Sequence, residues 1–143
     1  AVETDMTIFY RRLALVPAEG EVSGDLLAPD RLGAAFYGPV PDDHGRRLAA
    51  WLDRYRARLA GEGRPDAERR EAMDRVNPCY VLRNYLAQEV IDAAEGGDAG
   101  PLHTLAEVLR HPYDAQPGRD HYAQKRPDWA RNKPGCSMLS CSS

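Results

Sequence analysis

The chain has 143 residues, a hydrophobic fraction of 43%, a charged fraction of 29% and a formal net charge of −3 with neutral histidines. These values are typical of a globular protein with one sizeable core. So mild a charge argues against electrostatic capture of nucleic acid or of an anionic membrane. No apolar run approaches the roughly 20 residues that cross a bilayer.

Helical periodicity organises the first half of the chain. Asp5 is the expected N-cap of a helix over about residues 6–16. A Gly- and Pro-rich stretch over 18–41 follows, with one apolar piece at 32–37 that should form one or two helical turns. A long amphipathic helix is predicted over 42–60, with one buried stripe. That stripe has apolar residues at i, i+3, i+4, i+7 and i+11: Leu48, Trp51, Leu52, Tyr55 and Leu59.

Proline and asparagine mark the helix starts in the second half. A third helix is expected over 65–76, because proline is favoured at the first helical position. A fourth is predicted over 78–95 with Asn77 as its N-cap. Its apolar residues surround most of the helix, which predicts a central position in the fold. A fifth helix is expected over 101–111.

The end of the chain has a different character. Residues 111–143 show little periodicity and are rich in Pro, Gly and Asp, so we expect an extended surface tail held by Tyr113, Tyr122 and Trp129. No segment shows sustained strand alternation. The sequence therefore predicts an all-α fold. About five helices should form an irregular bundle over 1–110, followed by a loop-rich tail over 111–143 that ends in Cys-Ser-Ser.

Several segments together resemble the C-terminal region of a known family. They are NPCYVLRNYLAQ at 77–88, PYDAQP at 112–117, PDW at 127–129 and the terminal SCSS at 140–143, with weaker likeness at 9–13 and 51–59. In this order they resemble the selenoprotein O family, whose bacterial members are often called YdiU-type.

This resemblance implies a C-terminal helical segment of a larger, kinase-like protein. The family acts as a protein adenylyltransferase, which binds ATP with Mg²⁺ or Mn²⁺ and transfers AMP to Ser, Thr or Tyr hydroxyls of other proteins. Its nucleotide and metal ligands lie upstream, so the resemblance implies no cofactor on this chain and a partner in the upstream catalytic domain. It also implies a bacterial, cytoplasmic location. We interpret Ala1 as a cut within a longer protein.

The residues themselves show no recognisable machinery for nucleotide transfer. That chemistry needs a backbone cradle for phosphates, a lysine and acidic or amide metal ligands. The only lysines are Lys125 and Lys133, both in the tail, and the paired glycines are typical of helix ends. The histidines show no zinc spacing with the cysteines. They are His44, His103, His111 and His121. We therefore predict neither a catalytic residue nor a metal site here, and expect the chain alone to be inactive.

Cys141 is the strongest functional candidate. It is the third residue from the end, where some members of the resembled family carry selenocysteine. An exposed thiol near a chain terminus is readily oxidised, so one hypothesis is a redox-responsive group and the other an inert surface cysteine. Cys136 lies five residues earlier and could form a local disulfide with it. Cys79 departs from the family pattern, which favours a longer or basic side chain, so we give it no family role.

Arg83 and Asn84 are polar residues on an otherwise apolar predicted helix. Arg83 could reach toward the kinase-like domain or its nucleotide. The favoured interpretation is a structural arginine that pairs with an acidic neighbour such as Glu89 or Asp92, because a buried guanidinium needs a partner.

Two other functions stay open at this point. One is a stand-alone helical interaction module that docks a partner through an apolar groove between the 42–60 and 78–95 helices. The other is a small thiol-redox protein built on Cys136 and Cys141. The odd number of cysteines, three in all, favours a reducing cytoplasm over a secreted disulfide framework.

Overall fold

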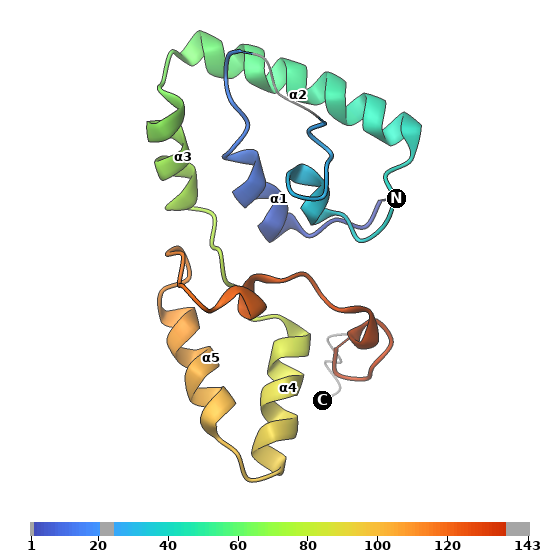
Figure 1. Ribbon diagram of the computed structural model, residues 1–143, viewed down its shortest axis with the longest axis vertical. Coiled ribbons are helices and arrows are strands. Elements are labelled where there is room, and N and C mark those ends of the chain that lie inside the picture. Colours follow the sequence, from blue (N-terminus) through green and yellow to red (C-terminus); the bar gives the residue numbers. More distant parts are fainter. Residues whose placement is uncertain (1, 21–24, 137–143) are drawn as a thin grey trace, which may run out of the picture. The chain divides into compact units, whose positions relative to one another are not determined.

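Helices and loops make up the part of the chain that the computed structural model describes, residues 2–20 and 25–136. Within these ranges there are five α-helices and three short 3₁₀ helices, and the one β-type pairing is an isolated bridge between Thr4 and Phe36. The predicted all-α class is confirmed. The chain divides into two compact units after Pro78 (Figure 1). The last two helices thus share a unit with the tail, whereas the sequence suggested a boundary after residue 110.

In the first unit, α1 (Met6–Leu13) begins where the sequence predicts. The Asp5 carboxylate accepts a hydrogen bond from the backbone N–H of Ile8 at 3.1 Å, which is the expected N-cap. The helix ends three residues before the predicted position, because the chain tightens there. The N–H of Val16 donates to the carbonyl of Leu13 at 3.1 Å, an i→i+3 bond of 3₁₀ type.

The 3₁₀ helix η1 (Leu32–Ala35) fulfils the expectation of a short helical turn at 32–37. Gly33 has to be glycine there, because a Cβ would collide with the backbone carbonyls of Leu27 and Ala28. The core of this unit joins α1, η1 and α2 (Asp42–Glu62). Its buried members are Leu13, Val16, Leu32 and Leu52, and half-buried side chains such as Phe9, Leu48, Tyr55 and Met73 pack against them.

A left-handed glycine ends α2. Gly63 has φ of +64°, the usual conformation after a helix C-terminus, and the helix ends at Glu62, two residues beyond the predicted end. After it, α3 (Asp66–Asp74) follows Pro65. The Arg11 guanidinium lies 3.2 Å from an Asp74 carboxylate oxygen and donates to the Asn77 carbonyl at 3.2 Å, so α1 is tied to the end of α3.

In the second unit the predicted start of the fourth helix is wrong. The helix α4 (Asn84–Glu95) begins at residue 84, not 78. The backbone N–H groups of Cys79 and Tyr80 both donate to the Pro112 carbonyl, at 2.6 and 3.1 Å, which holds this stretch out of a helix. Asn77 is not an N-cap either: its side-chain amide donates to the Met73 carbonyl at 2.9 Å and so closes α3.

The fourth helix is also amphipathic instead of central. Its buried residues Tyr85, Leu86 and Val90 form one face, whereas Ile91 is exposed. That face packs on α5 (Gly100–Arg110), and α4 and α5 lie side by side in Figure 1. The tail packs against the same buried residues of α4, and its Lys133 also contacts Asp92 on that helix.

The tail carries more structure than an extended segment. It contains two 3₁₀ turns, η2 (Asp120–Ala123) and η3 (Asp128–Ala130), and runs beside α4 in Figure 1. Tyr122 packs against the core as expected, and the Trp129 ring meets the edge of Tyr85 with centroids 6.3 Å apart. Tyr113 is largely exposed. Fully buried Ala130 and nearly buried Cys136 show that the tail completes the core of this unit.

Candidate functional site

The cysteines occupy unlike environments. Cys136 is 4% exposed and packs in the core with Tyr85, Leu86 and Val90. Its side chain therefore acts as a packing residue in this conformation. Cys79 is half-buried, and both of these thiols are free. Cys141 lies outside the described residues. Its redox role, and a disulfide with Cys136, stay predictions.

A set of polar contacts joins the tail to α4, and we call it the tail clasp: Gln88, Asp92, Trp129, Lys133 and Gly135. The ammonium of Lys133 lies 2.7 Å from an Asp92 carboxylate oxygen and 5.5 Å from the centre of the Trp129 ring. Gln88 donates to the other Asp92 oxygen at 2.7 Å.

Charge and backbone geometry both favour the tail clasp. The hydrogen bond from Lys133, followed by that from Gln88, lowers the pKa of Asp92, and the same contact raises the pKa of Lys133. Gly135 has φ of +84°, and a Cβ there would lie 2.5 Å from the Gln88 side-chain oxygen. The positive φ therefore favours glycine at this position, and a Cβ would also displace the Gln88 side chain.

Arg83 and Asn84 lie at the beginning of α4 instead of inside it. Arg83 is half-buried and extended, with φ of −97° and ψ of 145°, and its carbonyl accepts from Ala87 at 3.0 Å. Asn84 is the first helical residue. Both acidic residues that the sequence suggested as partners of Arg83 contact the tail. Glu89 lies 3.0 Å from His121, and Asp92 belongs to the tail clasp.

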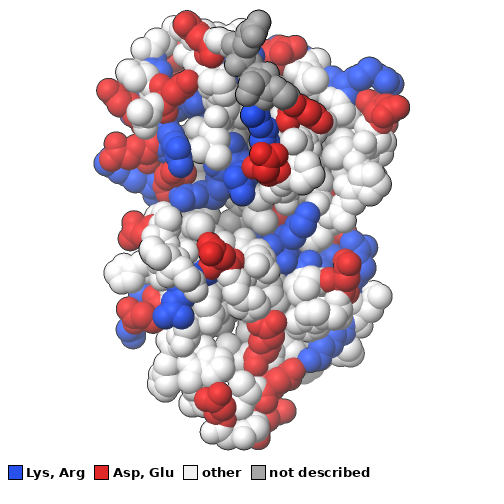
Figure 2. All heavy atoms as spheres, in the orientation of Figure 1, with Lys and Arg blue, Asp and Glu red and all other residues white. Residues whose placement is uncertain are grey.

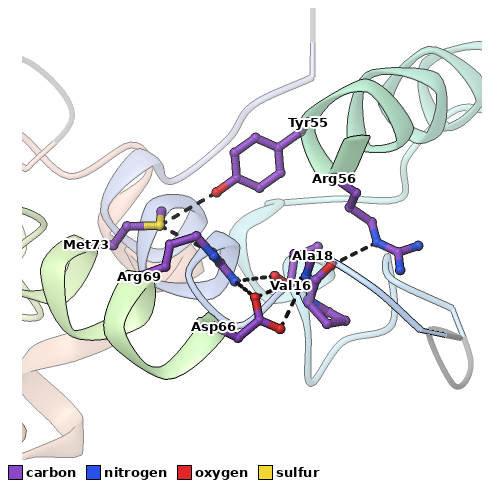
Figure 3. A network of polar contacts seen from close by, with 8 residues as sticks. Val16, Ala18, Tyr55, Arg56, Asp66, Arg69 and Met73 are labelled. Carbon is purple, nitrogen blue, oxygen red and sulfur yellow. Dashed lines mark hydrogen bonds and ion pairs between the residues drawn. The ribbon is translucent and has the colours of Figure 1, made fainter. Parts of the chain in front are cut away.

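The first unit contains a buried arginine that sequence reasoning missed. Arg69 is 5% exposed, and its Nη2 donates to the Val16 carbonyl at 2.6 Å and to Asp66 at 3.0 Å (Figure 3). Its Nη1 donates to the sulfur of Met73 at 3.5 Å. The Asp66 carboxylate also accepts from the backbone N–H of Ala18 at 3.1 Å. We call these five residues the arginine network.

The arginine network fastens the loop after α1 to α3. The hydrogen bond from Arg69 is the main cause that lowers the pKa of Asp66, so the pair favours the ionised carboxylate. Arg56, from α2, donates to the Pro17 carbonyl of the same loop at 2.9 Å, and the Tyr55 hydroxyl donates to Met73 sulfur at 3.6 Å (Figure 3). Side-chain donors from two helices, α2 and α3, thus bind one loop. The arrangement is structural, and nothing in it resembles an acid–base or nucleophilic pair.

Among residues 2–20 and 25–136, no three His, Cys, Asp or Glu side chains come close enough to hold a metal ion. Lys133, one of the two lysines, is engaged in the tail clasp. Charges of both signs alternate over the face of the molecule in Figure 2, without a broad basic area. No helix in the described part is long and apolar enough to span a bilayer.

Within the described residues, the chain is an all-α segment in two compact units. No protein-family model matches the chain. Proteins named protein nucleotidyltransferase YdiU do match, and 99% of the chain aligns with each of those that follow. The identity is 56% for the protein of Tolumonas auensis, 52% for that of Methylobacillus flagellatus and 53% for that of Rhodopirellula baltica.

The chain is homologous to a C-terminal region of these YdiU nucleotidyltransferases, which confirms the resemblance inferred from residues 77–88 and the other segments. It spans only about a quarter of the length of the curated relatives it matches: 26%, 26% and 28% in the three cases. The relatives are therefore much longer proteins, and most of each lies outside the part that this chain matches.

Proposed function

We propose that the chain is the C-terminal helical segment of a kinase-like protein adenylyltransferase, with a structural role and no active site of its own. The observation that carries this proposal is the alignment of nearly the whole chain with about a quarter of proteins named nucleotidyltransferases.

In this proposal, ATP and Mg²⁺ or Mn²⁺ bind to the preceding part of the polypeptide. That part would supply the chemistry, with AMP transferred from ATP to a Ser, Thr or Tyr hydroxyl of a protein and pyrophosphate released. The residues of this chain hold two helical units in shape through the arginine network and the tail clasp. Their contribution is to stability and position.

A redox role of the C-terminal tail is a second part of the proposal. Cys136 is packed in the core beside the tail clasp, where an oxidant has little access to its sulfur. Of these two thiols, we therefore expect Cys141 to be the one that is oxidised. Cys141 would then pair with a cysteine outside the described residues more readily than with Cys136, whose sulfur would first have to leave the core.

The test is a labelling experiment with ATP that carries a radioactive α-phosphate. The full-length gene product, with Mg²⁺ or Mn²⁺, should transfer label to itself or to a test protein, and the 143-residue chain alone should not. Robust labelling by the chain alone would contradict the proposal. A gene whose reading frame begins at Ala1 would favour the stand-alone interaction module instead.

A further inference from the structure

Four aromatic rings form a continuous series on the first unit. The ring centroids of Tyr10 and Phe9 are 5.8 Å apart, those of Phe9 and Trp51 are 6.4 Å apart, and those of Trp51 and Tyr55 are 5.4 Å apart with an interplanar angle of 5°. Met6 lies one helical turn before Tyr10 on α1. We call Met6, Phe9, Tyr10, Trp51 and Tyr55 the aromatic surface.

Part of the aromatic surface packs on the core, and the rest is exposed to solvent. Phe9 and Tyr55 pack on the core, whereas Met6, Tyr10 and Trp51 are 53%, 42% and 37% exposed. The sequence placed Trp51 in the buried stripe of α2, but it lies at the edge of that stripe. Exposed aromatic and methionine side chains that join into one surface are characteristic of interface cores, where they bury much apolar area.

The route of the chain favours the preceding polypeptide as the occupant. The residues just before α1 are fixed, since the N–H of Asp5 donates to the Ala35 carbonyl at 2.7 Å and the N–H of Tyr37 donates to the Glu3 carbonyl at 3.1 Å. In the relatives a much longer chain precedes the matched region. Such a chain would be tethered within a few residues of Met6, which gives it a high effective concentration at this surface.

The charges beside Trp51 indicate the chemistry of that occupant. Arg47, Arg54 and Arg58 lie four residues before, three after and seven after Trp51, so they share its side of α2. Two of them form exposed pairs, Arg47 with Asp43 at 3.5 Å and Arg58 with Glu62 at 3.1 Å. Exposed pairs of this kind contribute little to stability and can be exchanged for an interfacial partner.

We propose that the aromatic surface binds, within the same polypeptide, an apolar face of the preceding segment that is rimmed by Asp and Glu. This inference rests on the proposed function only in requiring a longer protein. It adds a defined surface to the structural role and states the chemistry of the segment that covers it.

The experiment uses the full-length protein with the photo-reactive amino acid p-benzoylphenylalanine at position 10, which replaces one ring by another. The matched control carries it at Ala57, an exposed position about 120° round α2 from Trp51. After irradiation in dilute solution, the linked peptides are identified by mass spectrometry. The expected result is an intramolecular link from position 10 to a peptide that precedes Ala1 and contains acidic residues, with at least a fivefold lower yield from position 57.

Three results would overturn the proposal: a link from position 10 to a second copy of the protein, a link only to residues of this chain, or equal yields at both positions. Failure of this proposal can be distinguished from failure of the proposed function. A protein that gives the expected link but transfers no AMP refutes the activity and leaves the surface in place. A protein that transfers AMP but links between copies refutes the surface alone.

Discussion

Replacing Arg69 by Met tests the arginine network, because Met keeps much of the side-chain volume and removes the charge. The Val16 carbonyl then loses a charge-assisted hydrogen bond of 2.6 Å in a buried place, which costs about 1.5–3 kcal/mol. The pair with Asp66 adds up to about 1 kcal/mol, because the Asp66 side chain is 46% exposed and solvent screens it. The expected loss in the free energy of unfolding is therefore about 1.5–4 kcal/mol.

The assay is urea unfolding of the chain, followed by the fluorescence of Trp51 in a Trp129→Phe background so that only the first unit reports. The control is Arg70→Met. Arg70 neighbours Arg69 on α3 but is 59% exposed and 3.8 Å from Asp74, so its loss should stay within about 0.5 kcal/mol. Equal unfolding free energies for the two variants would refute the reasoning.

The same variant has a pH signature with a definite sign. Arg69 lowers the pKa of Asp66 in the folded chain, so ionised Asp66 stabilises the fold above its ordinary pKa of 3.8. This contribution is lost as the pH falls through the lowered folded value. The stability difference between the parent and Arg69→Met should therefore shrink below about pH 4. A difference that is constant from pH 7 to pH 3 would show that Asp66 takes no part.

Two further substitutions and one alkylation experiment test the loops and the tail. Gly33→Ala should destabilise the first unit by about 1–3 kcal/mol in urea unfolding, because its Cβ meets two backbone carbonyls, whereas Gly38→Ala has open space and should not. Gly135→Ala should loosen the tail clasp and raise the rate of amide hydrogen exchange over 128–136. The control is Gly118→Ala, which is also at positive φ but has no close neighbours, and it should leave exchange over 128–136 unchanged. Native Cys136 should react with iodoacetamide at least tenfold more slowly than in urea, and comparable rates would contradict its burial.

Local chemistry made much of the first unit predictable. Asp5 is the N-cap that its position before an apolar, helically spaced run suggests, and the amphipathic pattern gave the long helix α2 within two residues at its end. These features depend on residues three to seven positions apart. They are visible in the sequence because the interacting groups are neighbours along it.

Long-range contacts account for what the sequence could not predict. The stretch after Asn77 looked like a helix start, but its N–H groups bond to the carbonyl of Pro112, over thirty residues away. Nothing in the sequence around Arg69 indicates burial, because the Val16 carbonyl that it binds lies 53 residues earlier. Cys136 gave no sign of burial, because the α4 face that covers it is remote in sequence.

The central claim is that nucleotide chemistry takes place outside these 143 residues. The most direct test is photo-labelling of the full-length protein with 8-azido-ATP and Mg²⁺, followed by peptide mapping. The account predicts that every peptide protected by excess ATP lies before Ala1. A specifically labelled peptide within the two helical units would contradict it.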